Sequence, residues 1–130
     1  KFPAVEFVAK ITMLPEFYPL VGKAKKADLK TAATTCYDLV QIHQACEWNM
    51  DYSMVYCAKN EDETLLQSAV DMKRNYDFST GLVAASFRTK KDFVAAIKSG
   101  VDFATVPPSV LEEAYKNLPA SEDVKKIRGQ

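Results

Sequence analysis

One strand–helix–strand unit decides the fold of this chain: TGLVAASFRTKKDFVAAIKSGVDFATV, residues 80–106. Its two ends, Thr80–Ser86 and Val101–Val106, are apolar and only weakly alternating, as expected of parallel strands covered on both faces. Between them, Thr89 is suited to cap the start of a helix and Gly100 to end it. The stretch therefore predicts two parallel strands joined by a crossover helix.

The same unit repeats along the chain. The expected strands are Val5–Thr12, Leu29–Thr35, Asp51–Cys57, Thr80–Ser86 and Val101–Val106. Their starts, at residues 5, 29, 51, 80 and 101, lie 24, 22, 29 and 21 residues apart, which fits one strand and one helix with short loops. The other expected helices are Phe17–Ala27, Tyr37–Trp48, Asp62–Asn75, Val110–Asn117 with Ser109 as its cap, and Ser121–Ile127.

This alternation predicts an α/β protein with a parallel sheet. Two architectures fit: a doubly wound open sheet, and part of a (β/α)₈ TIM barrel. The sequence has no GxGxxG or GxxxxGK[ST] loop, so the nucleotide-binding open sheet lacks its usual support. Eight strands are needed to close a barrel, and five units therefore predict an incomplete one.

Composition narrows the class of protein. A length of 130 residues suits a single domain, and 17 basic and 17 acidic residues cancel, which argues against a nucleic-acid partner. No apolar run is long enough to cross a membrane, and no signal-peptide pattern opens the sequence. The three cysteines are odd in number and lack CxxC spacing, which favours free thiols, no metal site and a cytoplasmic location. His43 reads as an ordinary helix residue.

The candidate chemistry lies at the carboxyl ends of the strands, where both architectures place their sites. Lys10 stands near the end of the first strand among apolar neighbours. Loss of solvation there would lower the pKa of its amine and make it a nucleophile towards a carbonyl. The alternative is a lysine held in a structural ion pair.

Five further polar residues lie at the ends of the other strands, which hold Thr34, Tyr56 and Ser86, or just after them, as Lys59 and Arg88 do. A phenol can relay a proton, while hydroxyl and cationic groups suit a phosphate. Each residue also has a plainer interpretation. Tyr56 fits a core or rim aromatic, Lys59 a solvated loop lysine, and Ser86 with Arg88 the cap and charge of the following helix.

Two linked motifs resemble a known family: LVAASFRT at residues 82–89 and SGVDFATVPPSVL at residues 99–111. They closely resemble the transaldolase family, and best its small branch of fructose-6-phosphate aldolases and transaldolase-like proteins. The resemblance implies a (β/α)₈ barrel of the class I aldolase type, of which this chain covers the fourth strand onward. It also implies carbon–carbon bond cleavage or formation on ketose phosphates such as fructose 6-phosphate, with no metal or cofactor.

The intervals between the candidate residues resemble those between the family's site residues, and this implies which residues correspond. Lys10 matches the Schiff-base lysine, Thr34 the active-site threonine, and Tyr56 the proton-transferring tyrosine of the aldolase branch, where transaldolases usually have phenylalanine. Ser86 matches a phosphate contact, and Lys59 replaces a phosphate-binding arginine. Arg88 is a further phosphate-binding candidate.

The departures from the family pattern define an alternative. The family's first three strands, with an acidic residue that assists proton transfer, are absent, and KIT at residues 10–12 replaces K(I/V)P. The chain is thus expected to be a fragment of an enzyme, or a shortened non-catalytic relative that binds sugar phosphate or acts in assembly. Its exposed edges predict a homo-oligomer or a companion amino-terminal segment, and the terminal helix in residues 119–130 is expected to pack on a neighbouring subunit.

Overall fold

A sheet of five parallel strands forms the centre of the chain in the computed structural model, which describes residues 4–57, 62–116 and 118–129. The strands are β1 (Val8–Thr12), β2 (Lys30–Cys36), β3 (Tyr52–Tyr56), β4 (Gly81–Ala85) and β5 (Phe103–Ala104). The helices are a 3₁₀ turn η1 (Pro15–Phe17), α1 (Pro19–Lys26), α2 (Leu39–Glu47), α3 (Leu65–Tyr76), α4 (Lys90–Ser99), α5 (Pro108–Tyr115) and α6 (Pro119–Ile127).

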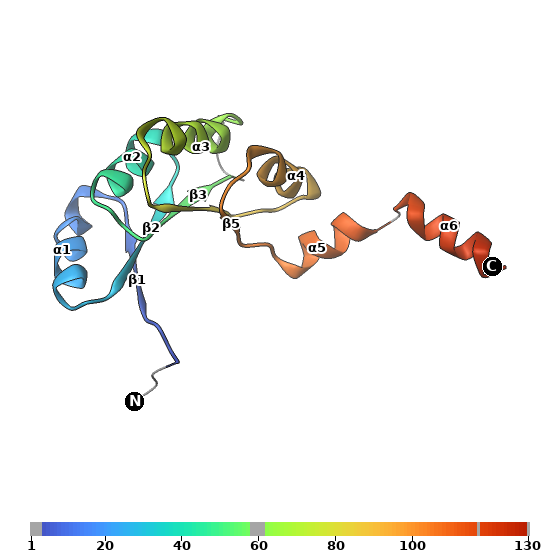
Figure 1. Ribbon diagram of the computed structural model, residues 1–130, viewed down its shortest axis with the longest axis horizontal. Coiled ribbons are helices and arrows are strands. Elements are labelled where there is room, and N and C mark those ends of the chain that lie inside the picture. Colours follow the sequence, from blue (N-terminus) through green and yellow to red (C-terminus); the bar gives the residue numbers. More distant parts are fainter. Residues whose placement is uncertain (1–3, 58–61, 117, 130) are drawn as a thin grey trace.

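The order of the strands decides between the two expected architectures. They lie in the sheet in chain order, β1-β2-β3-β4-β5, and every neighbouring pair is parallel. A doubly wound sheet reverses its order at a switch point, whereas a barrel adds each strand beside the last. Figure 1 shows α1–α4 along one side of the curved sheet, and α5 and α6 extending away from it. The incomplete barrel is therefore the architecture of this chain.

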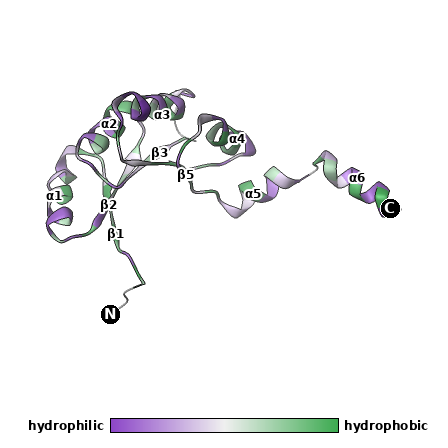
Figure 2. Cartoon of the chain, in the orientation of Figure 1, coloured by the Kyte–Doolittle hydropathy of each residue, from purple (hydrophilic) through white to green (hydrophobic). Residues whose placement is uncertain are grey.

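The core lies between the sheet and the helices. Ile11, Ala33, Val55, Leu82 and Ala84 alternate along their strands and are buried against the helices. The helices carry both hydrophobic and hydrophilic residues along their length, as amphipathic helices do (Figure 2). We call the opposite side of the sheet the inner face, and its residues include Lys10, Thr12, Ala32, Thr34, Tyr52, Met54, Tyr56 and Val83.

The helix signals read from the sequence are partly confirmed. Thr89 and Asp92 form a capping box at the start of α4, and Gly100 ends that helix with a left-handed φ of 71°. The expected cap at Ser109 is wrong, because α5 begins at Pro108, two residues before the expected start at Val110, and Pro107 is its N-cap. Proline fits the first position of a helix, where its missing N–H removes no helical hydrogen bond.

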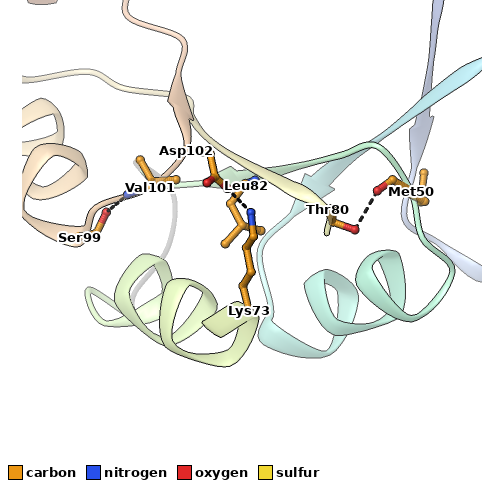
Figure 3. A network of polar contacts seen from close by, with 7 residues as sticks. All are labelled: Met50, Lys73, Thr80, Leu82, Ser99, Val101 and Asp102. Atoms are coloured by element: carbon orange, nitrogen blue, oxygen red, sulfur yellow. Dashed lines mark hydrogen bonds and ion pairs between the residues drawn. The ribbon is translucent and has the colours of Figure 1, made fainter. Parts of the chain in front are cut away.

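Polar contacts tie the amino-terminal ends of the strands together (Figure 3). The carboxylate of Asp102, just before β5, accepts hydrogen bonds of 2.8 Å from the Leu82 N–H of β4 and from Lys73 Nζ of α3. Burial on its own raises the pKa of Asp102, but the Lys73 and Leu82 hydrogen bonds and the Lys73 charge bring that pKa below its ordinary value. These contacts lie at the end of the sheet that supports stability in barrel folds.

Asp51, just before β3, makes the equivalent contact two repeats earlier. Its carboxylate accepts a 2.8 Å hydrogen bond from the Thr31 N–H of β2, so the same device appears twice, each time across 20 residues. These carboxylate–backbone hydrogen bonds help to fix the register of neighbouring strands. The register in turn decides which residues lie side by side at the carboxyl ends.

Candidate active site

Lys10 and Thr34 share the inner face of the sheet. In the parallel register, Lys10 lies beside Ala32 and Thr12 lies beside Thr34. Side chains alternate along a strand, so residues at positions 10 and 12 project from the same face as their partners at 32 and 34. Both residues lie on strands as expected, with Lys10 in the middle of β1 and Thr34 in the carboxyl-terminal half of β2.

Thr34 contacts Tyr56 beside a bulge in β2. Between Ala33 and Cys36 the register with β3 shifts, because three steps along β2 match two steps along β3. Thr35 takes up the extra residue with a φ of 56°, a left-handed conformation that is rare for a β-branched residue. The Thr34 Oγ1 and Tyr56 Oη atoms then lie 3.0 Å apart, in hydrogen-bond contact. This contact joins β2 and β3 through side chains on the inner face.

The two hydroxyls of this pair are shielded from solvent to different degrees. Thr34 is buried, whereas Tyr56 is half-buried. A shared hydrogen bond in which either hydroxyl can be the donor suits a relay that passes a proton in either direction.

Lys10 is exposed in this chain, which corrects the expectation that apolar neighbours enclose it. The residues beside it on the inner face are small or polar, Ala32 and Thr12, and the helices lie on the other side of the sheet. In a closed eight-stranded barrel the inner face becomes the packed interior. Five strands leave it open, and this is the physical reason for the difference.

Ser86 and Arg88 occupy the strand end next to Tyr56. Tyr56 pairs with Ala85 across β3 and β4, so Ser86 follows directly, and it adopts a left-handed φ of 64°. Arg88 is exposed, and its backbone N–H donates a 2.8 Å hydrogen bond to Asp92 in the first turn of α4. Both residues therefore stand where the chain leaves the sheet for a helix amino terminus, a position that favours anions. Lys59 lies outside the described residues.

Two residues that the sequence analysis did not select complete this rim. Tyr37, just after β2, packs edge-on against Tyr56 with ring centroids 5.0 Å apart and an interplanar angle of 71°. Gln41, on α2, accepts a 2.9 Å hydrogen bond from the Tyr37 N–H and donates one of 2.8 Å to the Met13 carbonyl. The only sequence signal for this pair is the four-residue spacing from Tyr37 to Gln41 at a helix start.

A cavity of about 260 Å³ lies beside this site, between the starts of α3 and α4. Tyr56 and Cys57 line it, together with the charged residues Asp62, Glu63, Lys91 and Asp92. Lys10, Thr34 and Ser86 do not line it. Most of its lining comes from the helix side of the sheet, and Tyr56 is the described candidate residue that it shares with the inner face.

Metal-binding clusters, disulfides and membrane-spanning helices are absent among the described residues. Within residues 4–57, 62–116 and 118–129, no group of three or more His, Cys, Asp and Glu side chains is placed to hold a metal ion. All three cysteines are free, and burial raises the pKa of Cys36 to about 11, which keeps that thiol protonated near neutral pH. Across the same ranges, no helix is long and apolar enough to span a bilayer.

The order of the strands and their parallel register together define part of a TIM barrel. The sequence model of the family described as Transaldolase/Fructose-6-phosphate aldolase matches residues 4–129. The chain belongs to this family, and the resemblance predicted from residues 82–111 is confirmed.

Known proteins support the same grouping. A "Probable transaldolase" of Anaeromyxobacter sp. (strain Fw109-5) is 27% identical over 127 residues, covering 94% of this chain and 59% of that protein. A second, from Caldicellulosiruptor saccharolyticus, is 32% identical over 116 residues and covers 85% of this chain and 54% of that protein. The chain thus spans between about half and three-fifths of the length of these curated relatives.

A solved structure shares the fold. The Bacillus subtilis YkuI protein, with an EAL domain and in complex with substrate c-di-GMP and calcium, aligns with a TM-score of 0.53 at 14% identity. The alignment covers 94% of this chain and 36% of that one. At this identity the likeness concerns the fold alone.

Proposed function

We propose that this chain supplies the catalytic lysine and proton relay of a class I aldolase or transaldolase that acts on ketose phosphates such as fructose 6-phosphate. The observation that carries the proposal is the 3.0 Å contact between Thr34 and Tyr56 on the face that also holds Lys10. Family membership supports the same type of chemistry. A nucleophilic amine and a phenolic proton relay on one face are the two groups that a Schiff-base aldol cleavage needs.

Lys10 performs the covalent steps in this proposal. Its neutral amine attacks the ketone carbon of the donor, and loss of water leaves an iminium ion on Nζ. The bonding electrons of the scissile carbon–carbon bond then flow towards the positive nitrogen, giving an enamine and releasing an aldehyde. Protonation of the enamine carbon and hydrolysis return the amine and release the second product, or the enamine adds to a new aldehyde.

Tyr56 moves the proton. Cleavage requires removal of the proton from the hydroxyl on the carbon that becomes the aldehyde, and bond formation requires its return. Thr34 holds the phenol oxygen at 3.0 Å and gives the proton a second oxygen to pass through. Tyr56 also favours the aldolase branch over the transaldolase branch.

The phosphate of the substrate is held at the neighbouring strand end. Ser86 offers a hydroxyl there and Arg88 a guanidinium, and Lys59, outside the described residues, is the third phosphate-binding candidate. Because a lysine binds phosphate as a point charge and not through a bidentate fork, it gives weaker phosphate binding than the arginine it replaces.

Full activity requires the inner face to be enclosed. Lys10 is exposed here, so water reaches its amine, whereas a closed barrel would bury that amine among other side chains. Closing a barrel takes roughly three strand–helix units beyond these five. We propose that a companion amino-terminal segment, or another subunit of a homo-oligomer, packs over the inner face and excludes water from the site.

The exposure of Lys10 also favours a second candidate function, a non-catalytic relative that binds sugar phosphate or supports assembly. Titration calorimetry with fructose 6-phosphate, run beside a retro-aldol assay, separates the two. Heat of binding without release of glyceraldehyde 3-phosphate supports the non-catalytic function.

The enzymatic proposal is tested by turnover in two lysine variants. Lys10→Met removes the proposed nucleophile, and Lys30→Met removes another amine from the strands, one paired at 2.9 Å with Glu6. Retro-aldol release of glyceraldehyde 3-phosphate is expected to vanish in Lys10→Met and to persist in Lys30→Met. Equal turnover in Lys10→Met and wild type would reject Lys10 as the nucleophile.

A further inference from the structure

The Tyr56 side chain is supported from two sides at the rim of the sheet. One support is the Thr34 hydroxyl at 3.0 Å, and the other is the Tyr37 ring, packed edge-on with centroids 5.0 Å apart. A single hydrogen bond fixes the distance of a phenol oxygen but leaves its ring free to turn about the side-chain bonds. An edge-on aromatic contact restricts the plane of the ring.

Tyr37 is itself held in place by Gln41. The side-chain oxygen of Gln41 accepts the Tyr37 backbone N–H at 2.9 Å, and its amide nitrogen donates to the Met13 carbonyl at 2.8 Å. Met13 lies just past the strand that bears Lys10, and its own N–H donates to the Thr34 carbonyl at 3.1 Å. One amide group therefore links the end of β1 to the loop that carries Tyr37.

The start of α2 fixes Gln41 in turn. Asp38 caps this helix by accepting the Val40 N–H at 2.7 Å, which places Gln41 in the first turn, above the strand ends. The result is a continuous set of contacts from the β1 end through Gln41 and Tyr37 to the phenol of Tyr56. No member other than Tyr56 carries a group that the proposed chemistry uses.

We propose that Tyr37 and Gln41 are positioning residues, which hold the Tyr56 phenol against Thr34 and set its spacing from the Lys10 strand. The inference rests on the proposed function and deepens it. It assigns the geometry of proton transfer to two residues that touch neither the donor ketone nor the phosphate. Misplacing a proton-transfer group lowers the rate of that step without changing how the lysine condenses with its substrate.

Two substitutions of Tyr37 test the ring contact. Tyr37→Leu keeps the bulk and removes the aromatic edge, whereas Tyr37→Phe keeps the edge and serves as the rescue variant. Tyr37 is 37% exposed, so neither change opens a core cavity. We expect kcat for retro-aldol cleavage to fall about tenfold in Tyr37→Leu, part of the roughly 10²–10⁴-fold that general acid–base catalysis contributes. Borohydride trapping of the Lys10 adduct and KM should stay within about twofold of wild type, and Tyr37→Phe should restore kcat.

Gln41→Glu tests the amide link through pH. The carboxylate keeps an oxygen for the Tyr37 N–H but has no donor for the Met13 carbonyl, and regains one only when protonated. The loss of kcat in Gln41→Glu should therefore be about tenfold above the pKa of the new carboxyl and shrink below it. Gln44→Glu, the same change three residues further along α2, is the matched control and should follow wild type throughout.

A readout independent of catalysis separates failure of this inference from failure of the proposed function. Nuclear Overhauser contacts between the Tyr56 ring and the Thr34 methyl group should weaken in Tyr37→Leu and persist in Tyr37→Phe. If wild type forms no Lys10 adduct and releases no aldehyde, the proposed function fails while this contact still tests the positioning. Undiminished contacts in Tyr37→Leu, or a loss of kcat matched by an equal loss of Lys10 adduct, would overturn the inference.

Discussion

The Thr34 hydroxyl lies 3.0 Å from the Tyr56 phenol, across a bulge that shifts the register of β2 against β3. Without the extra residue at Thr35, alternation would continue unbroken past Ala33, and the pairing at the strand ends would differ by one residue. The bulge pairs Cys36 with Val55, so that Cys36 joins the core on the helix side, while Thr34 stays on the inner face beside Tyr56. The proton relay in the functional proposal depends on this hydroxyl pair.

Removing the phenol hydroxyl is expected to slow proton transfer and leave the lysine chemistry intact. Tyr56→Phe keeps the ring that packs on Tyr37 and loses the oxygen that contacts Thr34. We expect kcat for retro-aldol cleavage to fall roughly 10²–10⁴-fold, with the yield of borohydride-trapped adduct unchanged. Tyr52→Phe, a change on the same strand away from this pair, is the control. A Tyr56→Phe variant with wild-type kcat would remove Tyr56 from the mechanism.

Ser86 is expected to matter for phosphorylated substrates only. Ser86→Ala removes a hydroxyl from the end of β4, and we expect KM for fructose 6-phosphate to rise about tenfold, the loss of a hydrogen bond of roughly 1.5 kcal/mol to a charged group. KM for dihydroxyacetone, which has no phosphate, should change little. The steady-state comparison of these two substrates is the measurement, and an equal rise in both KM values would contradict a phosphate contact at Ser86.

The capping box of α4 is expected to stabilise the fold measurably. Thr89→Ala removes the side-chain acceptor for the Asp92 N–H, and loss of such a cap typically lowers the free energy of unfolding by about 1 kcal/mol. Thr64→Ala is the matched control, because Thr64 stands at the cap position of α3 without a side-chain cap bond. Urea unfolding followed by circular dichroism measures both, and equal losses would show that the capping box contributes nothing specific.

Asp102 is expected to make stability depend on pH under acid conditions. Its folded-state pKa is lowered, so its contribution is present above the unfolded carboxyl pKa of about 3.9 and is lost as pH falls through the folded value. Asp102→Asn should lose roughly 1 kcal/mol at neutral pH and show a flatter decline in acid. The partly exposed side chain limits the size of this effect.

Urea unfolding at a series of pH values, compared between Asp102→Asn and wild type, checks that expectation. Asp71→Asn breaks an exposed 3.7 Å pair with Arg74 and is the control, for which little change is expected. If the free energies of unfolding of wild type and Asp102→Asn differ by the same amount from neutral to acid pH, the Asp102 charge does not contribute to stability.

Local sequence signals predicted most of the fold. The five apolar stretches became the five strands, and Thr89 and Gly100 mark the ends of α4 because capping and left-handed termination are local properties. The last strand is shorter than expected, Phe103–Ala104 in place of Val101–Val106, since pairing with β4 is its only strand contact in the described sheet.

The candidate site was harder to predict because it depends on tertiary contacts. Spacing placed Lys10, Thr34 and Tyr56 at strand ends, but no local preference indicates a bulge with a threonine at positive φ. Gln41 was missed for the same reason, since its partner Met13 lies 28 residues away along the chain. The exposure of Lys10 was also unforeseen, because burial of an inner face depends on the number of strands that surround it.

Peptide mapping of the borohydride-trapped adduct tests the central claim most directly. The full chain is incubated with dihydroxyacetone and with fructose 6-phosphate, reduced, digested and analysed by mass spectrometry. The account predicts one modified lysine, at Lys10, with no adduct in Lys10→Met and an undiminished adduct in Lys30→Met. An adduct that remains in Lys10→Met, or one spread over the exposed lysines in proportion to their accessibility, would contradict it.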